Sequence, residues 1–343
     1  MRTLLASVAL VIGTGFPAIA QAADCAPLRI ENSVKMIPGH PARILLPIIL
    51  NGVQKTFLLD TGGALSTISS AAVKELNLPA YHSNHRLSFL QGQDSTDFVQ
   101  VHEVILGNAK NSGVQFQVVD RFGPPGTPQP PFDGILATGI FLHDDLDLDF
   151  GAGRVNFFSP DHCEGKVVYW PHQALAVVPV KEEQSHIDVP VTLDGHPLRA
   201  MIDTGAQFTT MDLSRAQQAI NFSPDAPSAG NAPKDNPQKQ IYPRRLSNLS
   251  FDGVTIQNPL VIIQPLQFGG GKTDDQVLGS RAERKDDAGN RLNADITIGM
   301  DILRHLHIYF ASRESRLYIT EAEPGESVLF KSSAPAQAAA PAQ

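Results

Sequence analysis

The sequence predicts a mainly β protein made of two related domains, with few short helices. Short apolar runs separated by Gly, Pro and Asn recur along the chain, as is typical of strands. The tripeptide Asp-Thr-Gly occurs at residues 60–62 and again at residues 203–205, each time after an apolar run. A chain of 343 residues has room for two domains, one for each copy.

The expected elements follow the chain in two similar series. In the first half, apolar runs typical of strands occur at residues 42–50, 57–59, 99–106, 114–119, 146–150 and 154–158. The second half echoes them at residues 187–193, 198–202, 246–251, 254–263, 306–310 and 316–320. Helical spacing is confined to residues 69–76, which begin at a Ser suited to cap a helix, and to residues 213–220.

The repeat runs without a gap around the two tripeptides. The offset of 143 residues that places Asp60 on Asp203 also places Ser66 on Thr209. We therefore expect a first domain over residues 24–160, a linker over residues 161–184 and a second domain over residues 185–325. The tail over residues 326–343 ends in Ala, Pro and Gln, a composition that predicts disorder.

The first 23 residues have the pattern of a signal peptide. Arg2 provides a basic start, residues 4–12 are apolar, and Ala20-Gln21-Ala22 is a small-residue cleavage site. The apolar stretch is too short to span a bilayer, and no later segment is long and apolar enough, so we expect no integral membrane segment after signal removal. The sequence predicts an exported protein, periplasmic or secreted.

Export bears on the two cysteines, Cys25 and Cys163. In an oxidising compartment they are expected to form a disulfide, the alternative being two unpaired thiols. The histidines show no metal-ligand pattern, so we expect no metal and no cofactor. His305 and His307 share one face of a predicted strand with no acidic partner nearby in the sequence, which indicates a solvated strand face. The net charge of −8 argues against nucleic acid as a partner.

An aspartate at the end of a buried strand is an unusual choice unless its carboxylate is needed there, because burial of a lone charge is costly. A single copy can be explained as a turn that merely ends a strand. Two copies related by a two-fold axis would instead bring Asp60 and Asp203 together. Such a pair holds one proton over a broad pH range, so that one carboxylate activates water while the other donates to a carbonyl group.

The segments 57–63 and 200–206 resemble the strand-borne catalytic motif of aspartic peptidases of the pepsin and retropepsin clan, and the short repeats resemble the bacterial retropepsin-type branch. The resemblance covers roughly residues 43–320. It implies an all-β fold of two related, closed β-barrel-like (acid protease) domains with a cleft between them, and catalytic Asp60 and Asp203. It also implies a glycine-bearing flap over the cleft, for which Gly92 and Gly230 are candidates. The residues expected to support the active-site turn are Thr61, Gly62, Thr204, Gly205, Ser66 and Thr209.

The family's later motif, two apolar residues followed by glycine, matches Ile298 and Gly299 in the second repeat. In the first repeat the position of this glycine falls on Ala137 or on Gly139, and the alignment leaves both open.

Three functions compete. The leading one is an exported aspartic endopeptidase that acts on polypeptide in extended conformation, as a monomer whose two repeats form an intramolecular pseudo-dimer. The second is a non-catalytic or weakly catalytic peptide-binding protein that keeps the fold. The third pairs the domains of one chain with those of another copy. The gap-free register favours pairing within one chain, and the presence of both aspartates favours catalysis.

Overall fold

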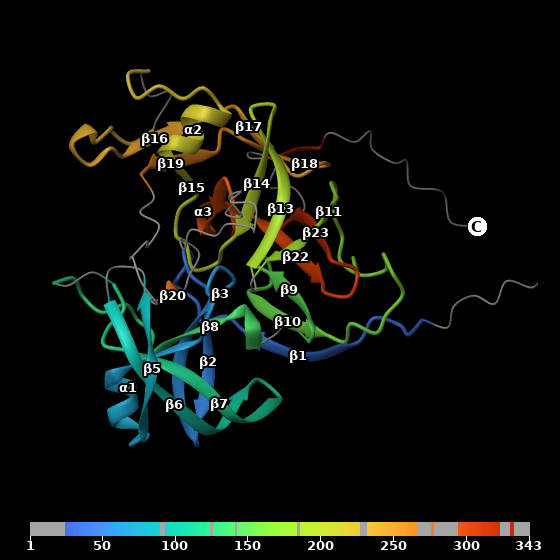
Figure 1. The fold of residues 1–343 in the computed structure, drawn as a ribbon. Coiled ribbons are helices and arrows are strands. Elements are labelled where there is room, and N and C mark those ends of the chain that lie inside the picture. Colours follow the sequence, from blue (N-terminus) through green and yellow to red (C-terminus); the bar gives the residue numbers. More distant parts are fainter. Residues whose placement is uncertain are drawn as a thin grey trace, which may run out of the picture.

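The computed structural model describes residues 25–89, 93–123, 126–140, 143–183, 186–226, 232–265, 276–277, 294–322 and 330–332. The described part is built mostly of strands with a few short helices, and its strands form three sheets (Figure 1). The predicted fold class, two acid-protease-like barrel domains, is confirmed. In the described part of the chain, no helix has the length and apolar character needed to cross a membrane.

The first repeat forms a closed barrel. Its strands lie in the order β2 (Leu45–Leu50), β3 (Val53–Asp60), β8 (Gly134–Ala137), β4 (Thr67–Ser69), β7 (Ala109–Val119) and β6 (Gln93–Leu106). The barrel closes because β6 also pairs with β2, at Ile105 and Val104. Two further strands, β5 (Ala80–Phe89) and β20 (Gln276–Val277), continue the sheet beyond β6. Along β2, buried and partly exposed residues alternate from Leu46 to Leu50, as expected for a strand of a barrel wall.

The second repeat forms a half-barrel. Its strand order is β16 (Tyr242–Arg245), β19 (Leu260–Gln264), β15 (Thr210–Asp212), β21 (Ile296–Ile298), β14 (His196–Ile202), β13 (His186–Leu193), β17 (Asn248–Ser250), β18 (Val254–Gln257) and β24 (Phe330–Ser332), with β12 (Lys181–Glu183) beside β13. The single run predicted over residues 254–263 is wrong. It divides into β18 and β19 because Asn258, with a φ of 51°, and Pro259 turn the chain between them.

The repeat offset of 143 residues holds for turns and helices as well as for the Asp-Thr-Gly motifs. The hairpins β2–β3 and β13–β14 turn at Asn51-Gly52 and at Asp194-Gly195, all four with positive φ. Two consecutive residues with positive φ give the turn whose twist matches antiparallel strands, and Asn, Asp and Gly adopt it with least strain. The two hairpins that lead to the two motifs are therefore built alike.

The helices are also equivalent. Helix α1 (Ser70–Glu75) begins after Ser69, whose hydroxyl accepts a hydrogen bond from a backbone N–H of its first turn. Helix α2 (Leu213–Ala219) begins after Asp212, whose carboxylate does the same. The structure thus confirms the two helices predicted from the sequence, and each cap satisfies a backbone donor that the helix leaves unpaired.

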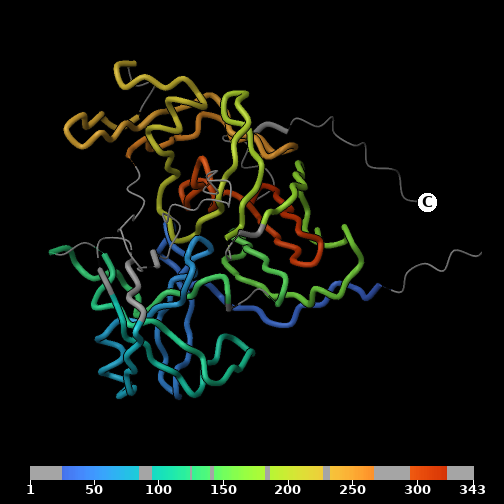
Figure 2. The backbone as a smooth tube through the Cα atoms, in the orientation of Figure 1, coloured from blue at the N-terminus to red at the C-terminus, as the bar shows by residue number. Residues whose placement is uncertain are grey.

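A six-stranded sheet joins the repeats. Its order is β1 (Ile30–Lys35), β10 (Arg154–Phe158), β9 (Asp145–Asp149), β22 (Leu306–Ala311), β23 (Arg316–Glu321) and β11 (Ala176–Pro179). The first repeat contributes β9 and the second β22, and these two pair antiparallel at the centre. In Figures 1 and 2 the first repeat lies below, the second above, and this sheet spans the junction beside them. Backbone hydrogen bonds therefore tie the two halves together.

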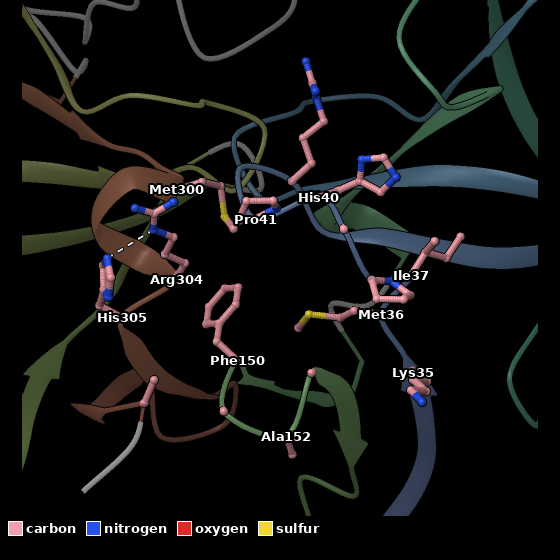
Figure 3. A pocket seen from close by; sticks show the side chains of 16 residues that line it. Lys35, Met36, Ile37, His40, Pro41, Phe150, Ala152, Met300, Arg304 and His305 are labelled. Carbon is pink, nitrogen blue, oxygen red and sulfur yellow. Dashed lines mark hydrogen bonds between the residues drawn. The ribbon is translucent and has the colours of Figure 1, made fainter. Parts of the chain in front are cut away.

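Next to this sheet, the connection from β1 to β2, the turn between β9 and β10, and helix α3 (Met300–Leu303) line an open cavity between the repeats (Figure 3).

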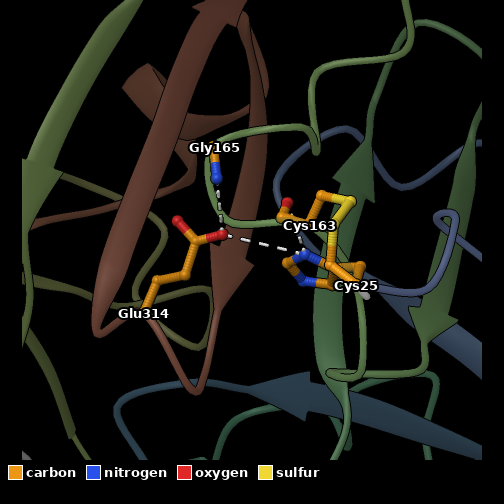
Figure 4. The surroundings of a disulfide bond; sticks show 5 residues. Cys25, Cys163, Gly165 and Glu314 are labelled. Atoms are coloured by element: carbon orange, nitrogen blue, oxygen red, sulfur yellow. Dashed lines mark hydrogen bonds and ion pairs between the residues drawn. A yellow bond between two sulfur atoms is a disulfide. The ribbon is translucent and has the colours of Figure 1, made fainter. Parts of the chain in front are cut away.

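The disulfide predicted between Cys25 and Cys163 is present, with its Cα atoms 4.8 Å apart (Figure 4). It ties the start of the described chain to the segment that follows β10. Beside it, the buried ring of His162 lies 2.6 Å from Asp145 through Nε2 and 3.7 Å from Glu314 through Nδ1. The backbone N–H of Gly165 donates to the same Glu314 carboxylate.

Removal of the disulfide is expected to destabilise the fold, because the bond closes a loop across 138 positions of sequence and restricts the unfolded chain. We expect Cys25→Ser/Cys163→Ser to lower the free energy of unfolding by about 2–5 kcal/mol in urea titrations. A reductant should lower the midpoint of the wild type and leave that of the double variant unchanged. Two alkylatable thiols in the unreduced wild type would contradict the pairing.

The expectation for His307 is wrong: its side chain is 3% exposed rather than solvated. Its Nε2 lies 2.7 Å from the Asp147 carboxylate, and its ring stacks on Trp170 with the centroids 3.7 Å apart. The reason is that β22 lies inside the six-stranded sheet, so that β9 supplies a carboxylate beside it and residue 170 covers it. The acidic partner stands 160 positions away in the sequence.

Candidate active site

Two equivalent strand pairs deliver Asp60 and Asp203 to the junction between the repeats. Strand β3 ends at Asp60, and β14 ends one residue before Asp203. Each strand pairs parallel with a strand from later in its own repeat, β3 with β8 and β14 with β21. The residues before both aspartates are buried in the core, so each carboxyl group projects from the end of a rigid strand.

The two carboxyl groups are in contact. Asp60 and Asp203 share a side-chain hydrogen bond. Each also lies against the glycine of the opposite motif: a methyl group on Gly62 would come within 2.6 Å of both Asp203 oxygens, and one on Gly205 within 2.6 Å of both Asp60 oxygens. Only residues without a side chain permit this approach. The glycines of the two motifs therefore allow the carboxyl groups of the two repeats to meet.

The two threonines lock the motifs together across the junction with four hydrogen bonds. The Thr61 hydroxyl donates to the Ile202 carbonyl oxygen at 2.7 Å and accepts from the Thr204 backbone N–H at 3.0 Å. The Thr204 hydroxyl donates to the Leu59 carbonyl oxygen at 2.7 Å and accepts from the Thr61 backbone N–H at 3.0 Å. Both threonines are fully buried, so these bonds fix the spacing of the two strands in a region without competing water.

Backbone donors hold the carboxylates in place. The Gly62 N–H donates to Asp60 Oδ1 at 2.9 Å, and the Gly205 N–H donates to Asp203 Oδ1 at 2.9 Å. The Ala206 N–H donates to the same Asp203 oxygen at 3.1 Å. One oxygen of each carboxyl group is thereby occupied by its own turn, which orients the group.

The environment favours retention of a proton on the pair. Burial raises the pKa of Asp60 well above its usual range, and the charge of Asp203 and the hydrogen bond with it raise this pKa further. The backbone hydrogen bonds from Gly62 and Gly63 act in the opposite direction, because they stabilise the charged carboxylate. In each carboxyl group the backbone holds one oxygen. The two adjacent groups can therefore share a single proton at pH values above those at which an isolated carboxyl group loses its proton.

The structure decides between Ala137 and Gly139. In the second repeat the Gly299 N–H donates to the Thr209 hydroxyl at 3.2 Å, and in the first repeat the Ala137 N–H donates to the Ser66 hydroxyl at 3.0 Å. Ala137 also pairs with Asp60 in register. Ala137 therefore occupies the position of the family glycine, and Ser66 and Thr209 brace equivalent strands behind the two aspartates.

Sequence reasoning missed Asp301. Its carboxylate accepts hydrogen bonds from both the backbone N–H and the hydroxyl of Thr209, each at 2.8 Å. Burial raises its pKa, while the hydrogen bonds from Thr209 act in the opposite direction. The equivalent position in the first repeat is Gly139, which has no side chain. The first repeat therefore lacks the hydrogen bonds that Asp301 accepts in the second. The sequence feature that could have indicated this role is an acidic residue two positions after Gly299.

Both candidate flap glycines, Gly92 and Gly230, lie outside the described residues. Gly92 belongs to the connection between β5 and β6, whose strands pair antiparallel up to Phe89 and Gln93. Within the described ranges, no group of three or more His, Cys, Asp or Glu residues is arranged to hold a metal ion.

Comparison with known proteins supports the repeat and identifies the family. The family model described as aspartyl protease matches the chain twice, over residues 46–139 and over residues 189–282. No curated protein matches the sequence. Each family match contains one Asp-Thr-Gly motif and the strands around it, and together the two matches cover more than half of the sequence. The chain therefore belongs to the aspartyl protease family, with two retropepsin-like repeats in one chain.

Proposed function

We propose that this protein is an exported aspartic endopeptidase that cleaves extended polypeptides with a water molecule activated by Asp60 and Asp203. The observation that carries the proposal is the contact between the two carboxyl groups, each seated on the glycine of the opposite motif. In this mechanism the ionised member removes a proton from the water, and the protonated member donates its proton to the carbonyl oxygen of the scissile bond. The resulting gem-diol intermediate then breaks its C–N bond. The amine nitrogen takes the proton that the base removed from the water, and one hydroxyl of the intermediate gives its proton to the other carboxylate, so the pair again holds one proton.

The peptide-binding alternative explains the site less well. A cleft that only binds peptide has no need for two poorly solvated carboxyl groups in contact, which are costly to keep in a folded protein. Pairing of domains between two copies is also disfavoured, because the contact between Asp60 and Asp203, the threonine hydrogen bonds and the β9–β22 pairing all form within a single chain. We propose a monomer, with the division into residues 24–160 and 185–325 as its two halves.

Cleavage of peptides by the mature protein tests the function. The chain without residues 1–23 should hydrolyse members of a diverse peptide library between about pH 3 and pH 7, the range in which paired carboxyl groups titrate. Activity should require one proton on the pair, so that it falls at low pH, where both carboxyl groups are protonated, and at high pH, where both are ionised. Chelators and serine- or cysteine-directed reagents should have no effect. Absence of cleavage at every pH would favour the peptide-binding protein.

Export is a separate part of the proposal. It is supported by the signal-like pattern of residues 1–23 and by a disulfide between Cys25 and Cys163, since disulfides persist in oxidising compartments. Mass spectrometry of the protein from its native host should find a mature N-terminus near residue 24 in the periplasmic or extracellular fraction. A full-length protein retained in the cytoplasm would contradict it.

Leu65 and Phe208 are proposed to contact the substrate. They occupy equivalent positions, each five residues after a dyad aspartate, and their side chains are 40% and 53% exposed although both are large and apolar. Exposed apolar side chains on the loops that carry a site indicate a surface for an apolar ligand. We expect Phe208→Ser to lower kcat/KM by roughly tenfold for peptides with large apolar residues near the scissile bond, and less for peptides with small ones.

The matched control for Phe208 is Val177, which is 37% exposed on the edge strand β11 of the six-stranded sheet. Val177→Ser removes a comparable exposed apolar side chain and should leave the cleavage of all peptides unchanged. Equal effects of both substitutions, or equal losses on all peptides, would rule out a role of Phe208 in specificity.

A further inference from the structure

A cavity of about 560 Å³ lies in the junction between the repeats, and neither Asp60 nor Asp203 lines it. Its walls come from three segments: the connection from β1 to β2, the turn between β9 and β10, and the region of helix α3. This volume is within the range of sites that hold small molecules. The cavity is therefore large enough for a ligand and distinct from the candidate active site.

The charge of this cavity is opposite to that of the protein. The chain has 35 acidic and 27 basic residues, yet the residues that line the cavity include no Asp or Glu. They do include Lys35, Arg43 and Arg304, together with His40 and His305. Within the described part of the chain, no ion pair involves Lys35, Arg43 or Arg304. Three like charges gathered without acidic partners around one cavity make it attractive to an anion.

The interior of the cavity is apolar. Figure 3 shows Phe150, Met36 and Met300 directed toward the same space, with Arg304 and His305 on one side of it and His40 on the other. The Nε of Arg304 donates to Nε2 of His305 at 3.1 Å, which leaves the two terminal NH₂ groups of the guanidinium for a ligand. An apolar interior with cations at the edge matches a molecule with an apolar body and one anionic end.

We propose that this cavity binds an anionic amphiphile, a molecule with a carboxylate or phosphate head on an unbranched apolar chain. The head lies at the cationic edge that includes Arg304 and Arg43. The apolar chain packs on Phe150 and the two methionines, toward Lys35 on the opposite side (Figure 3). The site borders the active-site loops, since Met300 directly follows Gly299, whose N–H donates to the Thr209 hydroxyl.

Calorimetric titration of the full mature chain with decanoate, kept below its micelle-forming concentration, tests this proposal. Decyl phosphate tests the alternative head group, while decanol lacks the charge and inorganic phosphate lacks the apolar chain. We expect saturable binding of one molecule of decanoate or of decyl phosphate. Arg43→Gln/Arg304→Gln should weaken binding at least about tenfold, as expected for the loss of charge-assisted hydrogen bonds.

Arg313→Gln is the matched control, because Arg313 is an exposed arginine paired with Asp161 outside this cavity, and it should bind as the wild type does. A measurement on the unmodified protein gives independent evidence: decanoate should protect Lys35 from acetylation, read by mass spectrometry, and leave Lys74 reactive. The proposal is wrong if neither anion binds, if decanol or inorganic phosphate binds as tightly, if the double variant keeps wild-type affinity, or if Lys35 is not protected. Because binding is measured, the result does not depend on peptidase activity.

Discussion

Asp60→Asn and Asp203→Asn are each expected to abolish peptide hydrolysis while preserving the fold. Asparagine is nearly isosteric with aspartate, but its amide can neither accept the proton of the attacking water nor share a proton with the partner carboxyl group. Since the two groups act as a unit, either substitution should lower kcat by at least about a thousandfold, and the double variant should lose little more. The measurement is the rate of cleavage of a peptide selected from the library, with circular dichroism to establish folding.

Stability provides a second readout that separates the roles of charge and of structure. In the folded protein the pKa of Asp60 is raised, so above the ordinary pKa of an aspartate the folded state binds more protons than the unfolded chain. The free energy of unfolding therefore falls as pH rises from that value toward the raised pKa. Asparagine carries no charge at any pH, so the Asp60→Asn variant does not lose stability in this way as pH rises. Asp60→Asn should be more stable than the wild type at neutral pH, although it is inactive.

Asp252 offers the control for these substitutions. It is an exposed aspartate in a turn with a φ of 55°, a conformation that asparagine adopts readily, so Asp252→Asn should change neither activity nor stability. Retention of full activity by either dyad variant would refute the catalytic assignment. A dyad variant that is inactive because it is unfolded would be recognised by its circular dichroism, and the stability prediction would then be wrong.

Gly62→Ala and Gly205→Ala should be nearly as damaging as loss of a carboxyl group. In each case the new methyl group would lie within 2.6 Å of both carboxylate oxygens of the aspartate in the opposite repeat, a distance far below van der Waals contact. The carboxyl groups must then separate, which removes the shared proton. We expect a loss of at least about a hundredfold in kcat and a destabilisation of about 1–3 kcal/mol, as for overpacked cores.

The source of the clash can be tested by a double-mutant cycle. Asp203→Ala removes the group that the methyl on Gly62 meets, so Gly62→Ala should cost less stability in that background than in the wild type. Gly205→Ala, whose methyl meets Asp60, should cost as much in the Asp203→Ala background as in the wild type. Gly139→Ala is the control: a methyl there meets nothing within 4 Å and should be tolerated. Additive losses in the Gly62 cycle would contradict the contact.

Some features follow from local sequence alone. The hairpin turns, the helix caps and the aspartates at strand ends each depend on the conformational preference of one or two residues or on the burial of a short run, so the sequence predicts them directly. The gap-free repeat then predicts that equivalent residues meet, as Asp60 and Asp203 do.

Other features depend on partners that are distant in the sequence. In the first repeat, the sequence allowed either Ala137 or Gly139 at the position of the family glycine. Only the register of β3 with β8 places Ala137 beside Asp60. His307 reads as a solvated residue until β9 brings Asp147 beside it. No spacing rule connects Arg43 with Arg304, which share a cavity because the two repeats pack against each other.

The sequence by itself therefore determined the repeat, the mainly β architecture and the identity of the two aspartates, because these depend on local preferences and on an internal copy. The tertiary structure alone decided which residue replaces the family glycine, which histidine is buried and where cationic side chains gather. Such properties arise from strand register and from the packing of one repeat on the other, and the free energy of those contacts is shared among residues more than a hundred positions apart.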